Sequence, residues 1–497
     1  MKAKEILKLR SLSEQLTLLK KNQSTFNTGQ IDESIKFYEG KHPIDCDENL
    51  KDEWVTEKVD KGKKDGSGNA ILEDEQVFIR KTRMSLPYAQ QIVSNCVSFL
   101  YGNDIDLVLN SGRDDEKMQE AFKLFTRIWN DDLRMMGVLK NATQKECIET
   151  RSAIQFFIDE DGSRMKSKIL CRSKGYDIYR HKDENEKLDA VVIEYKRDKI
   201  EKGRLYSNVS TTDIWTVDGL LRYEGGKLIA SESKKAPISK ILFAYLEQDV
   251  PEFNCVKGLI STQDYCRSQH SNVNTRIGNP ALVVSGSLAS KPRYNDSVKI
   301  YEIKPVDGFD ATKSSSAMMN YLEISSAPES VKLEMQNNEN DIYRFTWPDL
   351  YKMMTEAKNG NMSTQSMKLT FLQAFVKIAE KRVTHDEFVS RCINIIKELG
   401  AVIYGNEDLK RLDVGFKYNS LLPDSISEMI NMLAVAVGAG ITSQENAVRM
   451  LTINTPETLQ EIRVEELNAA IKEQAVVEVQ PEELDGVENK RNEEGVN

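Results

Sequence analysis

The chain has 497 residues, of which 40% are hydrophobic and 29% are charged, which is typical of a soluble globular protein with two to four domains. No run of about 18 apolar residues occurs, and the N-terminus lacks the apolar core of a signal peptide, so we expect a cytoplasmic protein without a membrane span. The net charge of −10 argues against a protein that coats nucleic acid, because such binding needs clustered lysine and arginine, but it is compatible with a protein that lets DNA pass.

The first 150 residues are predicted to be mainly helical. A helix reaching about residue 30 has one apolar face, formed by Ile6, Leu9, Leu12, Leu16 and Leu19. Residues 57–74 are rich in charge and glycine, which favours a mobile surface loop. The other predicted elements are helices at 31–39, 83–101, 114–131 and 134–150 and a strand at 105–109.

Residues 153–245 have a different composition and are predicted to form antiparallel hairpins and a meander. Short runs of β-branched and aromatic residues alternate with turn signals such as Asp-Gly and Glu-Gly-Gly. The predicted strands are residues 154–158, 169–171, 190–196, 204–207, 213–217 and 220–223.

A long helix at residues 253–278 has an unusually thin apolar stripe. Polar residues interrupt or flank that stripe, namely Gln263, Arg267, His270 and Asn274. Such a helix is a weak core element in a monomer, so we expect it to pack against other copies of the chain. This pattern favours an assembly protein over an enzyme.

The C-terminal half is predicted to contain a β-containing excursion followed by helices. Strands are expected at 282–284 and 298–303, and helices at 328–345, 363–399, 426–438, 443–451 and 457–472. Trp347-Pro348-Asp349 ends the first of these helices. From about residue 475 the chain is rich in glutamate and is expected to be disordered or ordered only in a complex.

The sequence contains no recognisable catalytic set. The four histidines, at positions 42, 181, 270 and 385, lack the short spacing of a metal site, and neither a Walker loop nor a GxSxG motif occurs. His42 is interpreted as a structural residue of a tight turn. The seven cysteines show no CxxC spacing, which indicates reduced thiols. Asp104 with Asp106, and Glu73-Asp74-Glu75, are weak candidates for a divalent cation. We therefore predict no enzymatic activity, no cofactor and no metal.

Residues 350–362, between two predicted helices, are the more suggestive segment. They include Lys352, Lys358, Asn359 and Asn361, which in a ring could contact DNA phosphates weakly. An ordinary exposed loop in a monomer would explain the same residues.

Several motifs occur in a fixed order over about 430 residues. They are residues 37–44 (FYEGKHPI), Tyr101-Gly102-Asn103 at a helix end, the segments 153–161, 176–180 and 190–195, residues 235–244 before a helix, residues 341–349 (DIYRFTWPD) and residues 440–451. In this order and spacing the chain resembles the portal proteins of tailed bacteriophages, in particular those of long-tailed siphophages of Gram-positive hosts. Two departures are Phe37, where the family usually has tyrosine, and the long charged segment 57–74.

The resemblance implies an α+β portal fold, with a mainly helical wing, stem and crown, a β-rich wing segment and a β-containing clip. The implied domains are a wing (1–250, with a long wing helix and return at 363–422), stem helices (251–280 and 328–345), a clip (281–327), a tunnel loop (346–362), a crown (423–474) and an acidic tail (475–497).

The same resemblance implies a ring, with a dodecamer as the expected form, at one capsid vertex of the virion, assembled in the host cytoplasm. Double-stranded DNA would pass through it during packaging and ejection. Partners would be the terminase large subunit, head-completion or adaptor proteins, and the major capsid and scaffolding proteins. Lys332 and Arg344 are candidates for the stem lumen. The alternatives are another structural virion or scaffold-associated protein without a DNA channel and, third, a nuclease using Asp104 and Asp106.

Overall fold

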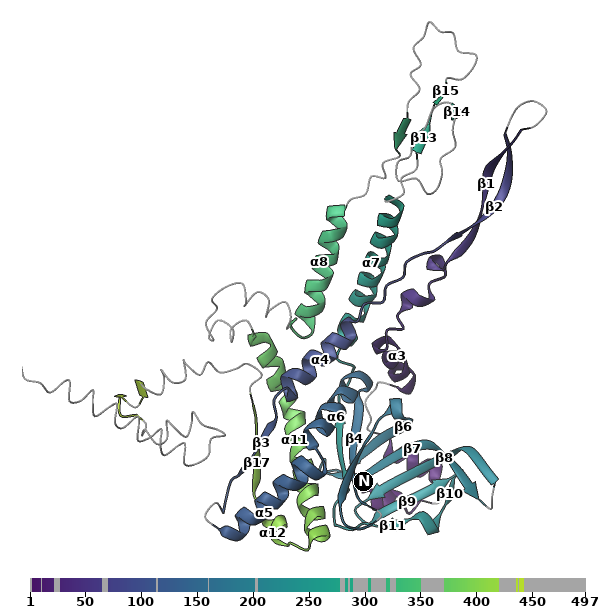
Figure 1. Ribbon diagram of the computed structural model, residues 1–497. Helices are drawn as coiled ribbons and strands as arrows, with labels where there is room; N and C mark the ends of the chain where they lie inside the picture. Colours follow the sequence, from purple (N-terminus) through teal and green to yellow (C-terminus); the bar gives the residue numbers. More distant parts are fainter. Residues whose placement is uncertain are drawn as a thin grey trace, which may run out of the picture. The chain divides into compact units, whose positions relative to one another are not determined.

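The computed structural model describes residues 2–9, 11–21, 27–64, 70–112, 115–159, 161–201, 204–277, 282–284, 287–288, 303–304, 319–321, 328–349, 371–419, 435–436 and 438–441 (Figure 1). The chain divides into two compact units, residues 1–360 with 370–421, and residues 361–369 with 422–497. Nearly all described residues belong to the first unit, and the helices predicted at 443–451 and 457–472 and the tail from 475 lie outside them. Within the described part, no helix is both long enough and apolar enough to cross a membrane.

The N-terminal segment forms three short helices rather than one long helix. These are α1 (Ala3–Ile6), α2 (Leu12–Leu19) and α3 (Thr28–Tyr38). The prediction of a helix to residue 30 is wrong because the backbone is extended at Ser11, which begins α2. Asn27 caps α3 by accepting a hydrogen bond from Gln30 N at 2.9 Å. The short helices η1 (Pro43–Cys46) and η2 (Glu48–Leu50) follow.

The charged segment predicted to be a loop is a β-hairpin instead. Strand β1 (Glu53–Lys64) pairs in antiparallel register with β2 (Ala70–Ile79). The loop prediction followed from the many charged residues and gave too little weight to β-branched residues such as Val55 and Val77, which favour extended backbone. Trp54 lies opposite Phe78, with ring centroids 5.0 Å apart, although both side chains are exposed.

The helical predictions for residues 83–150 are confirmed with shifted ends. The elements are α4 (Tyr88–Tyr101), β3 (Ile105–Leu109), α5 (Glu116–Arg127), the π-turn η3 (Ile128–Asp132) and α6 (Met135–Glu149). Helix α4 begins after Pro87 rather than at residue 83, because a proline disfavours helical backbone at the residue before it. Residues 80–86 belong to neither a helix nor a strand, and alternate N–H groups of this segment point to one side, as in an extended chain.

The predicted antiparallel β segment is confirmed and forms two sheets. One has the order β12-β4-β5, and the other has the order β10-β9-β8-β7-β6 with β11 also paired to β9. Residues 204–207 and 213–217, predicted as two strands, belong to one long strand, β8. The bounds are β4 (Arg151–Ile158), β5 (Met165–Leu170), β6 (Tyr176–Lys182), β7 (Leu188–Glu201), β8 (Arg204–Thr216), β9 (Gly219–Glu224), β10 (Lys227–Leu228), β11 (Lys234–Lys235) and β12 (Phe243–Glu247), with short helices η4 (Arg172–Lys174) and η5 (Ala230–Glu232).

Strand β7 contributes to an apolar cluster on each face of its sheet. Val191 and Ile193 pack in one cluster with Phe243 and other residues of the three-stranded sheet. Ala190 and Val192, on the opposite face, pack against α1 and α2. This alternation follows from the two-residue period of a strand, and it places the N-terminal helices over the larger sheet.

The remaining elements of the first unit are long helices and short strands. They are η6 (Asn254–Val256), α7 (Lys257–Ile277), β13 (Leu282–Val284), β14 (Ser287–Leu288), β15 (Ile303–Lys304), β16 (Met319–Tyr321), α8 (Pro328–Phe345), α11 (Leu372–Tyr404), α12 (Asp408–Arg411) and β17 (Val414–Tyr418). Strand β17 pairs with β3. Helix α11 extends past the predicted end at 399 and ends at Gly405, which has a φ of 65°. With its helices and antiparallel sheets, the chain has the predicted α+β class.

Candidate functional site

Two long helices flank the β-containing excursion, as the sequence predicts. Helices α7 and α8 lie side by side (Figure 1). Gln263 on α7 is buried and donates a hydrogen bond from Nε2 to the carbonyl oxygen of Met335 on α8 at 3.2 Å. Within the excursion, the described residues form two short antiparallel pairs, β13 with β16 and β14 with β15.

A second face of α7 carries a row of polar side chains, which we call the α7 polar stripe. It consists of Asp264, Ser268 and Asn272, spaced four residues apart. Their side-chain oxygens accept hydrogen bonds from three backbone N–H groups of the extended segment before α4. These bonds join Asp264 to Leu86 at 2.8 Å, Ser268 to Met84 at 2.8 Å and Asn272 to Thr82 at 2.7 Å.

The spacing of the two partners explains this arrangement. Four residues of a helix rise about 6 Å, and two residues of an extended chain span about 6.6 Å. Every second N–H of the segment therefore meets every fourth side chain of the helix. Asn272 also donates from Nδ2 to the Thr82 carbonyl oxygen at 3.2 Å, so both backbone groups of that residue are paired.

The stripe shows how a helix with a thin apolar face is held within one chain. Asp264, Ser268 and Gln263 are 0%, 0% and 1% exposed, so polar residues complete the buried face within one chain. Packing of the remaining faces of this helix against other copies of the chain stays a prediction. The expectation of an oligomer therefore rests on the family resemblance and not on the thin apolar stripe of this helix.

Asp264 also forms a buried pair with His42. Its Oδ2 lies 2.5 Å from His42 Nδ1, and the side chains are 0% and 1% exposed. The other ring nitrogen, Nε2, lies 3.1 Å from the Phe37 carbonyl oxygen, and the imidazole stacks on the Phe37 ring at 4.1 Å. Both ring nitrogens therefore face an oxygen acceptor, which fixes the orientation of the imidazole from two sides. His42 is thus structural, as predicted, but it anchors a helix 222 residues away.

A group of polar side chains, which we call the buried junction, lies where α4, α6 and α11 meet the end of α8. Glu252 accepts a hydrogen bond from Trp347 Nε1 at 2.7 Å and pairs with Lys381 of α11 at 2.6 Å. Lys381 also donates to Gln248 at 2.8 Å. Trp347 is fully buried and stacks on Phe99 at 5.8 Å. These contacts fix the chain where it leaves α8.

Burial shifts the pKa values of the ionisable groups in the buried junction. It raises the pKa of Glu146 to about 7, although the Lys381 ammonium acts in the opposite direction. Burial, with Lys381 adding to it, lowers the pKa of His385 to about 3, so this imidazole is neutral near pH 7. Tyr101 Oη lies 2.9 Å from His385 Nδ1. For Lys381, burial is outweighed by the neighbouring acidic groups, and its pKa is held well above the ordinary value.

The buried junction contains one group of side chains with the spacing of a metal site. Among the described residues, Cys96, Cys147 and Glu252 place their ligand atoms within 4.8 Å of one another. The Lys381 ammonium, however, lies 2.6 Å from the Glu252 carboxylate and 3.9 Å from Cys147 Sγ. A cation there would have to displace an ion-paired ammonium, so the donor set does not favour a metal.

The predicted stem residues both lie on α8. Lys332 and Arg344 are exposed. They are separated by twelve residues, which corresponds to about 18 Å along the helix axis and roughly 120° around it. The structure therefore does not bring them to one point. The predicted tunnel-loop residues Lys352, Lys358, Asn359 and Asn361 lie outside the described residues.

The other candidates for metal chemistry are dispersed. Asp104 precedes β3, and Asp106 lies in β3 opposite Lys417 of β17. The acidic run 73–75 lies in strand β2. His181 is buried in β6, and His270 lies on α7 at 3.2 Å from Asn274 Nδ2. None of these residues belongs to the cysteine–glutamate group, the one candidate metal cluster in the described part of the chain.

The polar residues next to the stripe stand out in the sequence, but the stripe itself was not predicted. The signal was present, because Asp264, Ser268 and Asn272 recur every four residues on a helix that lacks apolar residues there. Recognising it would have required matching this spacing to an extended segment ending at a proline. That partner lies about 180 residues earlier in the chain.

Comparison with known protein families gives a match over most of the chain. A family model described as "Phage portal protein, SPP1 Gp6-like" matches residues 19–475. No curated protein sequence matches the chain. Among solved structures, a chain of "Neck of empty GTA particle computed with C6 symmetry" is similar at 9% identity with a TM-score of 0.40. The match covers 75% of this chain and 91% of that chain.

Proposed function

The chain belongs to the SPP1 Gp6-like phage portal protein family, whose model matches nearly its whole length, and we propose that it forms a ring at one capsid vertex through which double-stranded DNA is packaged and ejected. Proteins of this family are structural components of the virion and not enzymes. The observation that carries the proposal is the match over residues 19–475, which includes both long helices and the excursion between them.

An exposed apolar face on α11 supports assembly into a ring. Leu372, Val376 and Val383 are 55%, 53% and 75% exposed. With the exposed Ala379 they lie within about 60° of one another around the helix axis. Exposed apolar residues grouped on one face indicate a surface for another protein. A second copy of the chain is the occupant that a ring requires.

Substitutions on this face test the assembly. Val376→Asp combined with Val383→Asp should shift rings to monomers, because two carboxylates would be buried between subunits without partners. Negative-stain images and light scattering would measure the change. Val402→Asp is the matched control, since Val402 lies on the same helix, is 47% exposed and is outside the face. Wild-type protein that remains strictly monomeric would refute the ring.

For the channel, we propose that residues 346–362 form a tunnel loop whose Lys352, Lys358, Asn359 and Asn361 contact DNA phosphates. Lys332 and Arg344 on α8 would add contacts along the stem. The net charge of −10 suits a lumen through which DNA slides. An acidic surface makes few attractive contacts with phosphates, so the moving DNA would not be held back.

Alanine substitutions separate these contacts from assembly. Lys352→Ala with Lys358→Ala should reduce packaging or retention of DNA, while images still show rings. Lys332→Ala with Arg344→Ala, compared in the same packaging assay, reports on the stem. Unchanged packaging in the first variant would mean that the loop lysines do not contact DNA.

The domains and partners are assigned from the same family membership. We propose a wing (1–250 with 363–422), a stem (251–280 and 328–345), a clip (281–327) and a crown (423–474). The clip would dock the terminase large subunit and the head-completion or adaptor proteins. Capsid and scaffolding proteins would contact other parts of the ring, of which a dodecamer is the expected form. A variant lacking residues 289–302 should lose terminase binding in a pull-down and keep ring assembly.

The alternative is a structural virion or scaffold-associated protein without a DNA channel. Rings that lack a central hole in the images would favour it. The nuclease reading predicts cleavage of DNA in magnesium or manganese, and intact DNA after incubation with the purified protein would exclude it.

A further inference from the structure

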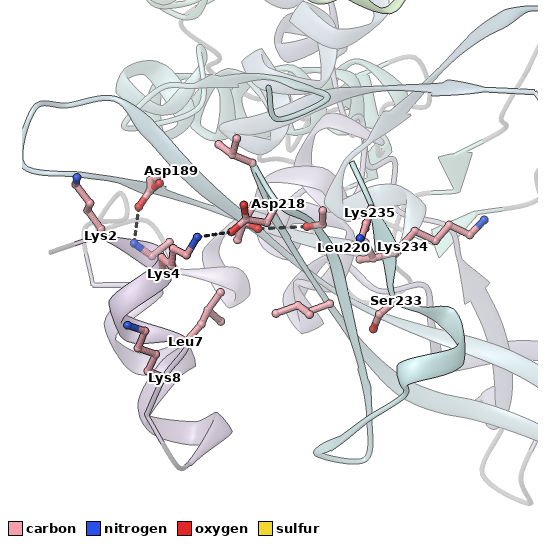
Figure 2. Close-up of a pocket in the computed structure, with 15 residues that line it drawn as sticks. Lys2, Lys4, Leu7, Lys8, Asp189, Asp218, Leu220, Ser233, Lys234 and Lys235 are labelled. Carbon is pink, nitrogen blue, oxygen red and sulfur yellow. Dashed lines mark hydrogen bonds and ion pairs between the residues drawn. The ribbon is translucent and has the colours of Figure 1, made fainter. Parts of the chain in front are cut away.

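A pocket of about 630 Å³ lies between the N-terminal helix and the edge of the larger sheet. One wall is formed by α1 with Lys2 before it and Leu7 and Lys8 after it, and the opposite wall by β11 and the β8–β9 turn. Figure 2 shows Lys2, Lys4 and Lys8 on the first side and Lys234 and Lys235 on the second, with Asp218 between them. Lys2–Lys8 lie before the first residue of the family match.

The rim of this pocket is basic in a chain that is acidic overall. All five lysines are exposed, whereas the whole chain has a net charge of −10. Two carboxylates line the same pocket, and both have partners. Asp218 pairs with Lys4 at 3.3 Å, and Asp189 accepts a hydrogen bond from the backbone N–H of Ala3. The rim therefore carries a net positive charge toward solvent.

The floor of the pocket is apolar. Leu7 and Leu221 line it and are half-buried, and both pack against the apolar cluster that joins α1 and α2 to the larger sheet. Val217, in the β8–β9 turn, is 38% exposed and adds apolar surface at the margin. A concave apolar floor with charged groups at its edge is the usual form of a site that binds an amphipathic ligand.

The sheet edge brings the second pair of lysines to the pocket through a glycine. Gly219 in β9 pairs with Lys235 in β11, and its φ is 137°. A Cβ at this position would lie 2.1 Å from the Lys234 carbonyl oxygen. Only glycine allows this close approach of the two strands. The wall that carries Lys234 and Lys235 is thus fixed by the backbone.

We propose that this pocket is a docking site for an acidic amphipathic peptide segment of a partner protein. Glutamate or aspartate side chains of the segment would pair with the lysine rim, and its apolar side chains would cover Leu7 and Leu221. Charge complementarity favours an acidic partner, and the apolar floor favours a peptide over nucleic acid, because phosphate contacts need positive charge but no apolar cavity. The proposal does not depend on the DNA channel.

Fluorescence anisotropy of the full-length protein with a labelled probe tests the proposal. The probe is a short peptide of leucine and glutamate arranged with helical periodicity, and it should bind saturably at low salt. A peptide of glutamate alone should bind more weakly, and the same peptide with lysine in place of glutamate should not bind. Fluorescein-labelled duplex DNA is the competing ligand class.

Charge reversal on each wall locates the binding. Lys234→Glu with Lys235→Glu should weaken peptide binding by about tenfold or more, and Lys2→Glu with Lys8→Glu should do the same from the opposite wall. The matched control is Lys117→Glu with Lys123→Glu, which makes the same charge change at exposed positions on α5. Circular dichroism confirms that each variant is folded.

Three outcomes would overturn the proposal. In the first, the peptide does not bind the wild-type chain. In the second, the α5 control weakens peptide binding as much as the wall variants do. In the third, duplex DNA binds more tightly than the peptide, and both wall variants lose the DNA binding. The last outcome would assign the lysines to nucleic acid.

Discussion

The larger sheet and the α7 polar stripe hold their neighbours by different interactions. Strand β7 buries Val191 and Ile193 on one face and Val192 on the other, and these contacts are apolar. Helix α7 instead binds an extended segment through side-chain oxygens that accept backbone N–H groups. Apolar contacts tolerate changes of shape if volume is kept, whereas a buried hydrogen bond that loses one partner leaves the other unsatisfied. The two regions should therefore respond differently to conservative substitutions.

The largest effect is expected from Asp264→Ala in the polar stripe. The change removes the acceptor of the Leu86 N–H and leaves the buried His42 without its carboxylate. Each buried donor that loses its acceptor costs about 1–3 kcal/mol of the free energy of unfolding, and this variant leaves two such donors. Urea unfolding followed by tryptophan fluorescence would measure it. A double variant, His42→Leu with Asp264→Ala, should lose less than the sum of the single variants. Strict additivity would show that the two residues are not coupled.

The next effect is a pH dependence in the buried junction. The folded pKa of Glu146 is about 7 and its ordinary value is 4.5, because burial favours the neutral acid. Its contribution is fully present below pH 4.5 and is lost as the pH rises through about 7.

Glu146→Gln tests this contribution, since glutamine keeps the shape of the neutral acid. Between pH 4.5 and 8, the wild-type chain should lose on the order of 3 kcal/mol relative to the variant. His385, whose lowered pKa acts in the opposite direction, is present in both proteins and cancels in the difference. Parallel unfolding profiles of the two proteins would contradict the assignment.

The smallest effect compares one substitution in each region. Ser268→Ala removes the acceptor of the Met84 N–H and should cost about 1–3 kcal/mol. Ile193→Leu keeps the volume of a fully apolar contact and should cost less than about 1.5 kcal/mol. Thermal unfolding of both variants would rank them. If the leucine variant is the less stable, the contrast between the two regions is wrong.

The regions that were predictable from sequence are those with a regular apolar period. The alternation in β7, the stripe of α11 and the buried face of α4 all follow from one local pattern, so their elements were found. The hairpin β1–β2 was missed because its many charged residues suggested a loop, although its β-branched residues favour strands. The helix predicted to residue 30 is interrupted by the extended backbone at Ser11.

The candidate site was less predictable, because its contacts join residues far apart in sequence. His42 and Asp264 are separated by 222 positions, and the pocket joins α1 to β11 across more than 200 residues. Neither contact has a local pattern. The stem residues Lys332 and Arg344 were placed on the expected helix, and their contact with DNA stays a prediction.

The polar stripe recognises a backbone and not side chains, which has a consequence for how this chain can vary. The helix binds this segment only through the backbone N–H groups of residues 82, 84 and 86. Any amino acid but proline supplies one. A saturation scan should therefore find most residues accepted at these three positions, while Asp264, Ser268 and Asn272 tolerate few. The constraint lies on one partner alone, so sequence drift along the extended segment leaves the interface intact.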